Sequence, residues 1–124
     1  MIQLDILIIT LILILLDIVF GFAGAVKEKN VQSGMLRQGL WHKAGFIGLI
    51  ILAYVIEITA SYTDLGIEIP SVLAVCVYII LTECVSIFEN LCVLNPKIVD
   101  SPLGSIFYHA HKIEEAEKLE DENA

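Results

Sequence analysis

The chain has 124 residues, and its composition is far from that of a soluble protein of this size. Apolar residues make up 57% and charged residues only 18%, and the mean hydropathy is +0.82. Average soluble domains are about 45–50% apolar and about 25% charged, and so short a chain has little interior to hide the difference. The composition therefore excludes a soluble or disordered chain and predicts a membrane protein. The net charge of -8 argues against a nucleic-acid partner, because phosphate selects basic surfaces.

Three segments are long and apolar enough to cross a bilayer as helices: residues 4–26, 44–62 and 70–94. A spanning helix needs about 20 mostly apolar residues, and the first segment reaches about 34 Å at about 1.5 Å per residue. Its apolar run is continuous rather than alternating, which excludes a barrel strand. The segment also resembles a cleavable signal peptide. We expect it to be retained, because Asp5 precedes the apolar run and Lys27 and Lys29 follow it.

Lys and Arg residues lie on alternate sides of the three predicted spans. The first connection carries four of them, the second carries none, and the remaining three follow the third span. The positive-inside rule then places the first connection and the C-terminus in the cytoplasm. The sequence therefore predicts an all-α membrane protein with three transmembrane helices, N-terminus outside and C-terminus inside. Residues 1–96 form the membrane domain and residues 97–124 an acidic cytoplasmic tail.

Residues 33–43, in the first connection, have the pattern of a short amphipathic helix. Apolar residues recur there at helical spacing with cations between them, and a serine at the start suits the N-cap. We expect this helix to lie at the inner membrane face, with a tryptophan at headgroup depth, and to run into the second span. The residues that define it are Ser33, Arg37, Leu40, Trp41 and Lys43.

Every predicted span carries a carboxylate, and none carries a cation. A charge at mid-bilayer costs about 2.5–3.5 kcal/mol, so these groups are expected to face protein or water, and the isolated subunit to associate with copies of itself. Two interpretations stay open: a lumen lining or protonation switch, and protonated groups hydrogen-bonded inside one bundle. The residues of this polar stripe are Asp17, Glu57, Glu83, Ser86 and Asn90. Glu89 lies near the inner interface, where its side chain is expected to reach water.

Small residues at four-residue spacing occur in the first two spans and permit close helix approach. On the second span two of them lie roughly opposite Glu57, so that helix has two faces turned away from lipid. This pattern favours a homo-oligomer. The predicted packing residues are Gly21, Gly24, Ala25, Ala44 and Gly48.

No motif for catalysis or for a metal or cofactor is recognised. His109 and His111 would point apart on a helix, and the three cysteines fit no zinc spacing. No nucleophile is accompanied by a base. We therefore expect no enzyme activity, no catalytic residues, no metal and no cofactor.

The chain resembles the toxin-secretion/phage-lysis holins, a family of small three-span membrane proteins. The resemblance covers Leu16-Asp17 with Gly21 and Ala25, then the 33–43 connection, then Glu83-x-x-Ser86-Ile87-x-Glu89-Asn90. It implies a phage or prophage protein of the bacterial inner membrane that self-associates and permeabilises that membrane. An endolysin, or in some relatives a toxin, then passes without binding stably. The acidic tail and Glu57 depart from the family pattern.

Two other functions use the same features. A proton-coupled carrier or small ion channel would use the intramembrane carboxylates as a relay. A membrane scaffold without a pore would hold partners through residues 33–43 and the acidic tail. The first predicts graded flux without host death, and the second predicts an intact membrane potential.

Overall fold

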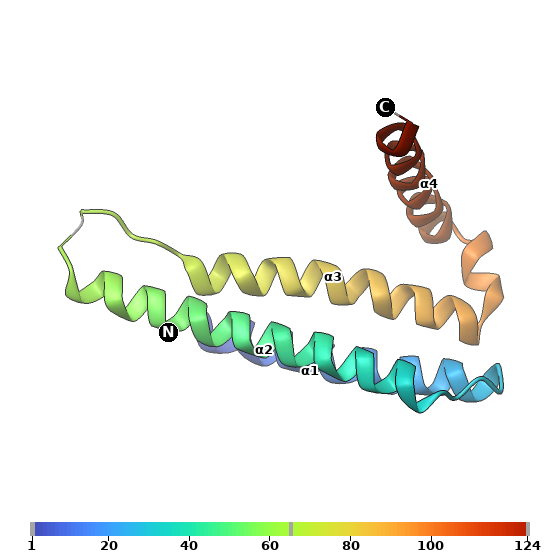
Figure 1. Cartoon of the computed structure of the whole chain (residues 1–124), viewed down its shortest axis with the longest axis horizontal. Helices are drawn as coiled ribbons and strands as arrows, with labels where there is room; N and C mark the ends of the chain where they lie inside the picture. Colours follow the sequence, from blue (N-terminus) through green and yellow to red (C-terminus); the bar gives the residue numbers. More distant parts are fainter. Residues whose placement is uncertain (1, 65, 124) are drawn as a thin grey trace.

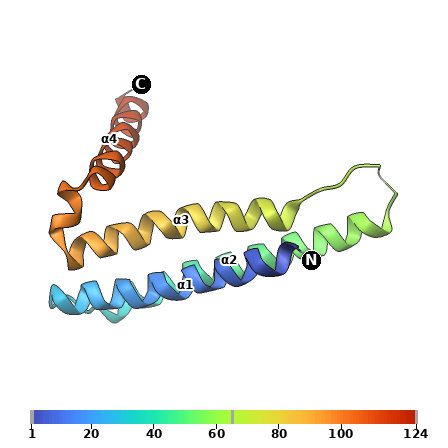
Figure 2. The same cartoon turned by 180° about the vertical axis from the view of Figure 1, so that it is seen from behind.

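The computed structural model describes residues 2–64 and 66–123, with the side chains of all but residues 2, 3, 103 and 107–115. Three long helices lie side by side, and a fourth leaves them at an angle (Figures 1 and 2). The elements are α1 (Ile2–Lys27), α2 (Ser33–Tyr62), α3 (Ser71–Leu94), the 3-10 helix η1 (Pro96–Asp100) and α4 (Pro102–Asn123). The first three are long and apolar enough to cross a membrane. This confirms the all-α class with three candidate spans, while sidedness and oligomeric state remain predictions.

The ends of α1 and α3 follow local sequence, whereas at the start of α2 the predicted N-cap Ser33 is the first helical residue and Gln32 is the N-cap, without a side-chain hydrogen bond. α1 closes with a Schellman motif around Lys29, which has φ 55°: Asn30 N–H donates to the Ala25 carbonyl at 3.0 Å, and Lys29 N–H donates to Val26 at 3.1 Å. α3 begins after Pro70 and ends at Leu94, with Asn95 as its C-cap just before Pro96, because the residue before a proline disfavours helix. The third predicted span therefore agrees with α3 to within one residue.

α2 is one unbroken helix of 30 residues, about 45 Å long. Residues 33–43 are helical as expected, but they continue into the span with no break (Figure 1). The expectation of a separate interfacial helix is therefore wrong, because a helix that lies along the membrane face must change direction before it crosses. The sequence Lys43-Ala44-Gly45 holds no proline to produce that change. Leu40 and Trp41 are exposed on this part of α2.

α1 and α3 are parallel neighbours that touch along their length, whereas α2 runs antiparallel to both and packs mainly on α3. Two glycines of α1 permit the close approach. A Cβ at Gly21 would lie 3.5 Å from Asn90 Nδ2, and one at Gly24 would lie 3.5 Å from Val93 Cγ1. The buried apolar residues among the three helices are Ile14, Ile50, Ala53, Val72, Cys76 and Ile79.

Most large apolar side chains point outward from this small core. Exposed Leu, Ile, Val and Phe residues cover the outer faces of α1, α2 and α3. A soluble monomer rarely exposes contiguous apolar patches of this extent. This apolar surface is suited to the hydrocarbon core of a membrane.

The turn from η1 into α4 depends on a glycine. Ser101 Oγ accepts a hydrogen bond from Gly104 N–H at 3.2 Å, as an N-cap side chain does. A Cβ at Gly104 would lie 2.3 Å from the Val99 carbonyl oxygen, so the backbone would have to shift to admit any other residue. α4 therefore begins at Pro102, directly after Ser101.

We predict that Gly24→Leu separates α1 from α3 and lowers the free energy of unfolding by about 1–3 kcal/mol. The cause is overlap with Val93, which already lies at van der Waals distance from the Cβ position. Thermal unfolding in detergent, followed by circular dichroism, measures the change. Gly24→Ala is the matched control, since its methyl group fits the space. Equal stability of the leucine variant and the parent would contradict this packing.

Candidate functional site

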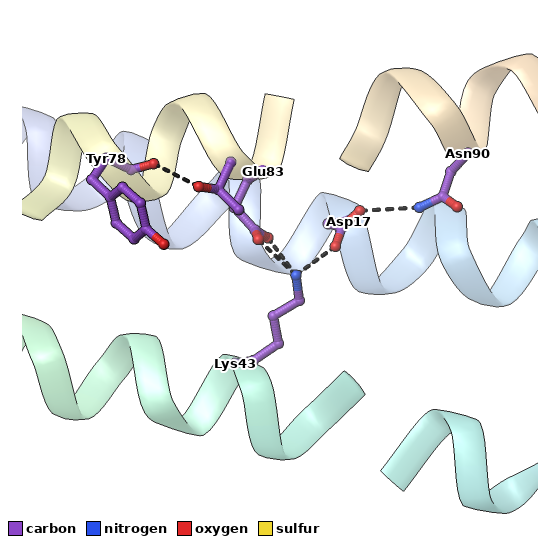
Figure 3. A network of polar contacts seen from close by, with 6 residues as sticks. Asp17, Lys43, Tyr78, Glu83 and Asn90 are labelled. Atoms are coloured by element: carbon purple, nitrogen blue, oxygen red, sulfur yellow. Dashed lines mark hydrogen bonds and ion pairs between the residues drawn. The ribbon is translucent and has the colours of Figure 1, made fainter. Parts of the chain in front are cut away.

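A buried ion network joins the three long helices (Figure 3). Lys43, from α2, reaches between α1 and α3, and its Nζ lies 2.5 Å from Asp17 Oδ2. The same ammonium lies 2.7 Å from Glu83 Oε1 and 2.6 Å from Oε2. Asn90, on α3, donates from Nδ2 to Asp17 Oδ1 at 3.0 Å. Every carboxylate oxygen of the network therefore has a donor, and each long helix contributes to it.

The network is almost closed to its surroundings. Asp17 is 7% exposed and Glu83 1%, and the Lys43 side chain is 15% exposed. Among the described residues, no buried side-chain nitrogen or oxygen is left without a hydrogen-bond partner. Two carboxylates share one ammonium, so the fully ionised network keeps one negative charge in excess.

The network lies about halfway along the bundle. Asp17, Lys43 and Glu83 are each some three turns from the helix end next to the 28–32 connection or η1, which is about 15 Å. The hydrocarbon core of a bilayer is about 30 Å thick. If α1 and α3 cross the membrane, the three charges meet near its midplane.

The premise that the spans carry no cation is wrong. It followed from a boundary at residue 44, which left Lys43 in the connection. Residues 43 and 57 lie on nearly the same side of a helix at about 100° per residue, so a helical wheel extended by one position places Lys43 on the stripe of Glu57, Ile50 and Ala53. This signal was present in the sequence. The choice of Asp17 and Glu83 as partners required the tertiary structure.

Glu57 does not join the network. It lies fourteen residues beyond Lys43 on α2, about 21 Å away along the helix, and accepts a hydrogen bond from Val72 N–H at 3.0 Å. Ser71 Oγ donates to the Ala53 carbonyl at 2.9 Å nearby. Glu57 therefore binds a free amide in the first turn of α3, where a carboxylate is favourable.

The other predicted polar residues of α3 are less enclosed. Ser86 is half-buried, and Glu89 is exposed. The structure therefore brings together Asp17, Glu83 and Asn90 from the predicted stripe and adds Lys43. The side chains of His109 and His111 lie outside the described residues.

A second polar contact fixes the ends of α1 and α3. Lys27 Nζ donates to the carbonyl of Val93 at 2.7 Å and to that of Leu94 at 3.0 Å. These carbonyls end α3, where a cation is favourable because of the helix dipole.

A groove of about 330 Å³ lies between α1 and the first half of α2. It extends from Asn30 and Gln32 in the connection to Asp17 and Lys43 in the network. α1 and α2 touch little elsewhere, so the groove separates them where α2 begins. Its walls are Asp17, Ile18, Gly21, Ala25, Asn30, Gln32, Met35, Leu36, Gly39, Leu40, Lys43 and Asn90.

The predicted packing residues divide into two groups. Gly21 and Gly24 face α3, and Ala25 borders the groove. Ala44 is exposed, and a Cβ at Gly48 would meet nothing within 4 Å. The small residues of α2 are therefore not used within the subunit.

Three apolar helices around an internal ion network define a small helical membrane protein without an evident catalytic constellation in its described part. A model of the Bacteriophage holin family matches residues 3–107, which is most of the chain. The chain belongs to this family, whose members are membrane proteins that form pores and are not enzymes. The match ends inside α4, so the acidic cluster of the tail lies beyond it. No curated protein and no solved structure matches the chain.

We predict that the two carboxylates substitute for each other in stabilising Lys43. Asp17→Asn or Glu83→Gln alone leaves one carboxylate for the ammonium and costs about 1 kcal/mol or less. The double variant leaves a buried ammonium unpaired and costs about 3–5 kcal/mol. Unfolding of the four proteins in detergent gives the double-mutant cycle. Additive effects of the two substitutions would show that Lys43 does not depend on both.

Proposed function

We propose that the chain is a holin that assembles in the bacterial inner membrane and opens it, so that an endolysin passes and the host lyses. The family match over residues 3–107 carries this proposal, and the apolar outer surface of the three helices supports it. A toxin is the alternative cargo, by analogy with the toxin-secretion holins. The lipid bilayer and other copies of the chain are the proposed partners.

We infer an orientation with the N-terminus outside and the C-terminus inside. The ends of α1 and α3, the 28–32 connection and η1 all lie at one end of the bundle (Figure 1). Lys27, Lys29 and Lys97 belong to this end, and the 63–70 connection at the other end has no Lys or Arg. The positive-inside rule then assigns the lysine-bearing end to the cytoplasm.

Self-association is now proposed from the small residues of α2 alone. The argument from carboxylates without a cation no longer applies, because Lys43 pairs with Asp17 and Glu83. The exposed small residues Ala44 and Gly48 on α2 support an interface instead, because small residues let helices from two subunits approach closely.

The proposed lumen lining requires a change inside the subunit. Asp17 and Glu83 point toward Lys43 inside the bundle, and Asn90 points toward Asp17. A polar stripe of these residues and Ser86 faces water only after α2 moves relative to α1 and α3. Glu57 is proposed for the same stripe nearer the other end of α2.

The membrane-opening function is tested by inducible expression in bacteria. A potential-sensitive dye and the release of a cytoplasmic reporter enzyme are followed together. A holin causes a delayed, abrupt loss of potential together with reporter release, because large lesions form only after assembly. Graded, pH-dependent flux without reporter release would favour the proton-coupled carrier or channel, and an intact potential would favour a scaffold.

We predict that Gly48→Leu reduces self-association and delays lysis. The larger side chain fills space that is open in the subunit and that a neighbouring helix would need. Leucine is the better helix former by about 1 kcal/mol, so α2 itself is retained. Cross-linking in membranes reports the oligomer, and culture density reports the delay.

The matched control for this substitution is Ala74→Leu, which enlarges an exposed small residue on α3. It is expected to leave cross-linking as in the parent. Unchanged cross-linking in the Gly48→Leu variant would remove this face of α2 from the interface.

A further inference from the structure

The two halves of α2 are attached to the bundle in different ways. The second half packs through Ile50 and Ala53 into the buried core, and Glu57 and Ser71 add hydrogen bonds to α3. These contacts are mostly apolar and remain favourable whether or not any side chain is charged. This half of α2 is therefore held firmly.

From Ser33 to Gly45, α2 is attached to the bundle mainly through one charged side chain. From Ser33 to His42 every residue is exposed except the half-buried Leu36. The groove separates this stretch from α1. Beyond Lys43, Phe46 packs against the buried core of Ile14, Ile50 and Ile79 and makes an edge contact to Tyr78, with ring centroids 6.4 Å apart. The Lys43 ammonium is thus the polar contact that binds this half to both α1 and α3.

The charged groups of Lys43, Asp17 and Glu83 are stable when paired in the bundle and when separated in water, but not when separated in hydrocarbon. In the bundle, the ammonium offsets the mutual repulsion of Asp17 and Glu83. In water, all three groups are solvated. In hydrocarbon, a separated charge costs about 2.5–3.5 kcal/mol or more. The first half of α2 is therefore stable either closed and paired or open and hydrated.

We propose that Lys43 is a positioning residue for membrane opening: it holds the first half of α2 closed on Asp17 and Glu83, and its withdrawal along the α1–α2 groove turns these carboxylates toward water. The groove leads from the network to the polar side chains of Asn30 and Gln32 at the bundle end, which is where water is available. This inference rests on the proposed holin function and assigns the regulation of its polar stripe.

The central test replaces Lys43 and measures the time from induction to lysis. Lys43→Met leaves two repelling carboxylates without a counter-ion, so lysis is expected earlier than in the parent. Lys43→Arg keeps the charge and the delay. Adding Asp17→Asn and Glu83→Gln to Lys43→Met removes the repulsion and restores a delay at least as long as the parental one. Lys97→Met, which removes an exposed cation of η1, is the matched control and leaves the timing unchanged.

A charge exchange keeps the test decisive if Lys43→Met does not accumulate in the membrane. Asp17→Lys combined with Lys43→Asp retains two acids and one cation in the same place. Its timing is expected near that of the parent, while Asp17→Lys alone shifts timing or fails to accumulate. Parental timing of Lys43→Met at parental abundance, or failure of both the exchange and the neutral triple variant to restore the delay, would overturn the proposal.

A second readout does not depend on lysis. Ala25→Cys places a thiol on the groove wall, in a chain whose Cys76, Cys84 and Cys92 are replaced by alanine. In membrane vesicles this thiol is expected to react faster with a water-soluble maleimide when Lys43→Met is added. Equal rates would refute the proposed role of Lys43 in holding the first half of α2 closed. If the parent never opens the membrane but the rates differ, that role of Lys43 stands and the holin proposal fails.

Discussion

One ammonium shared by two carboxylates sets the constraint under which the subunit is built. Lys43, Asp17 and Glu83 come from three different helices, so their contact requires the helices to meet at one depth. Because the contact is buried, its stability depends on the presence of both the ammonium and the carboxylates. A buried ion pair adds little stability over apolar packing, yet removing one partner is strongly destabilising. The network therefore specifies which helices meet more than it strengthens their packing.

This dependence on both partners suits the proposed function, in which the subunit first accumulates in the membrane without effect and opens it later. Apolar contacts hold α1 to α3 and the second half of α2 to α3, and they involve no charged group. The ionic contact responds to water and to neighbouring charge. A subunit that combines the two has a rigid part and a part whose position depends on its surroundings.

Much of the architecture follows from composition. The lengths of the apolar segments, Pro70 before α3 and Asn95-Pro96 after it fix three helices, and the family resemblance agrees with the family match. Asp17, Glu83 and Asn90 were selected because a polar side chain in an apolar helix is conspicuous. Lys43 was missed because it stands beside Trp41 and Arg37, where a cation is ordinary. The predicted boundary at residue 44 marks where the apolar sequence begins, whereas the helix itself continues as long as its backbone hydrogen bonds do.

The sequence alone could not predict which residues of different helices contact one another. Gly21 and Gly48 look alike as small residues in apolar surroundings, yet Gly21 faces Asn90 and Gly48 faces open space. Glu57 and Glu83 look alike as isolated acids, yet one binds a backbone amide and the other an ammonium. Only the arrangement of the helices distinguishes the members of each pair.

The hydrogen bonds from Lys27 to the last carbonyls of α3 restrict sliding between α1 and α3. Together with the close approach at Gly24 and the bond between Asp17 and Asn90, they fix the axial register of two parallel helices at three heights. A slide by one turn, about 5.4 Å, would break all three at once. α1 and α3 therefore behave as a single unit, and in the proposed assembly each subunit would contribute this pair of helices and α2 as two separate parts.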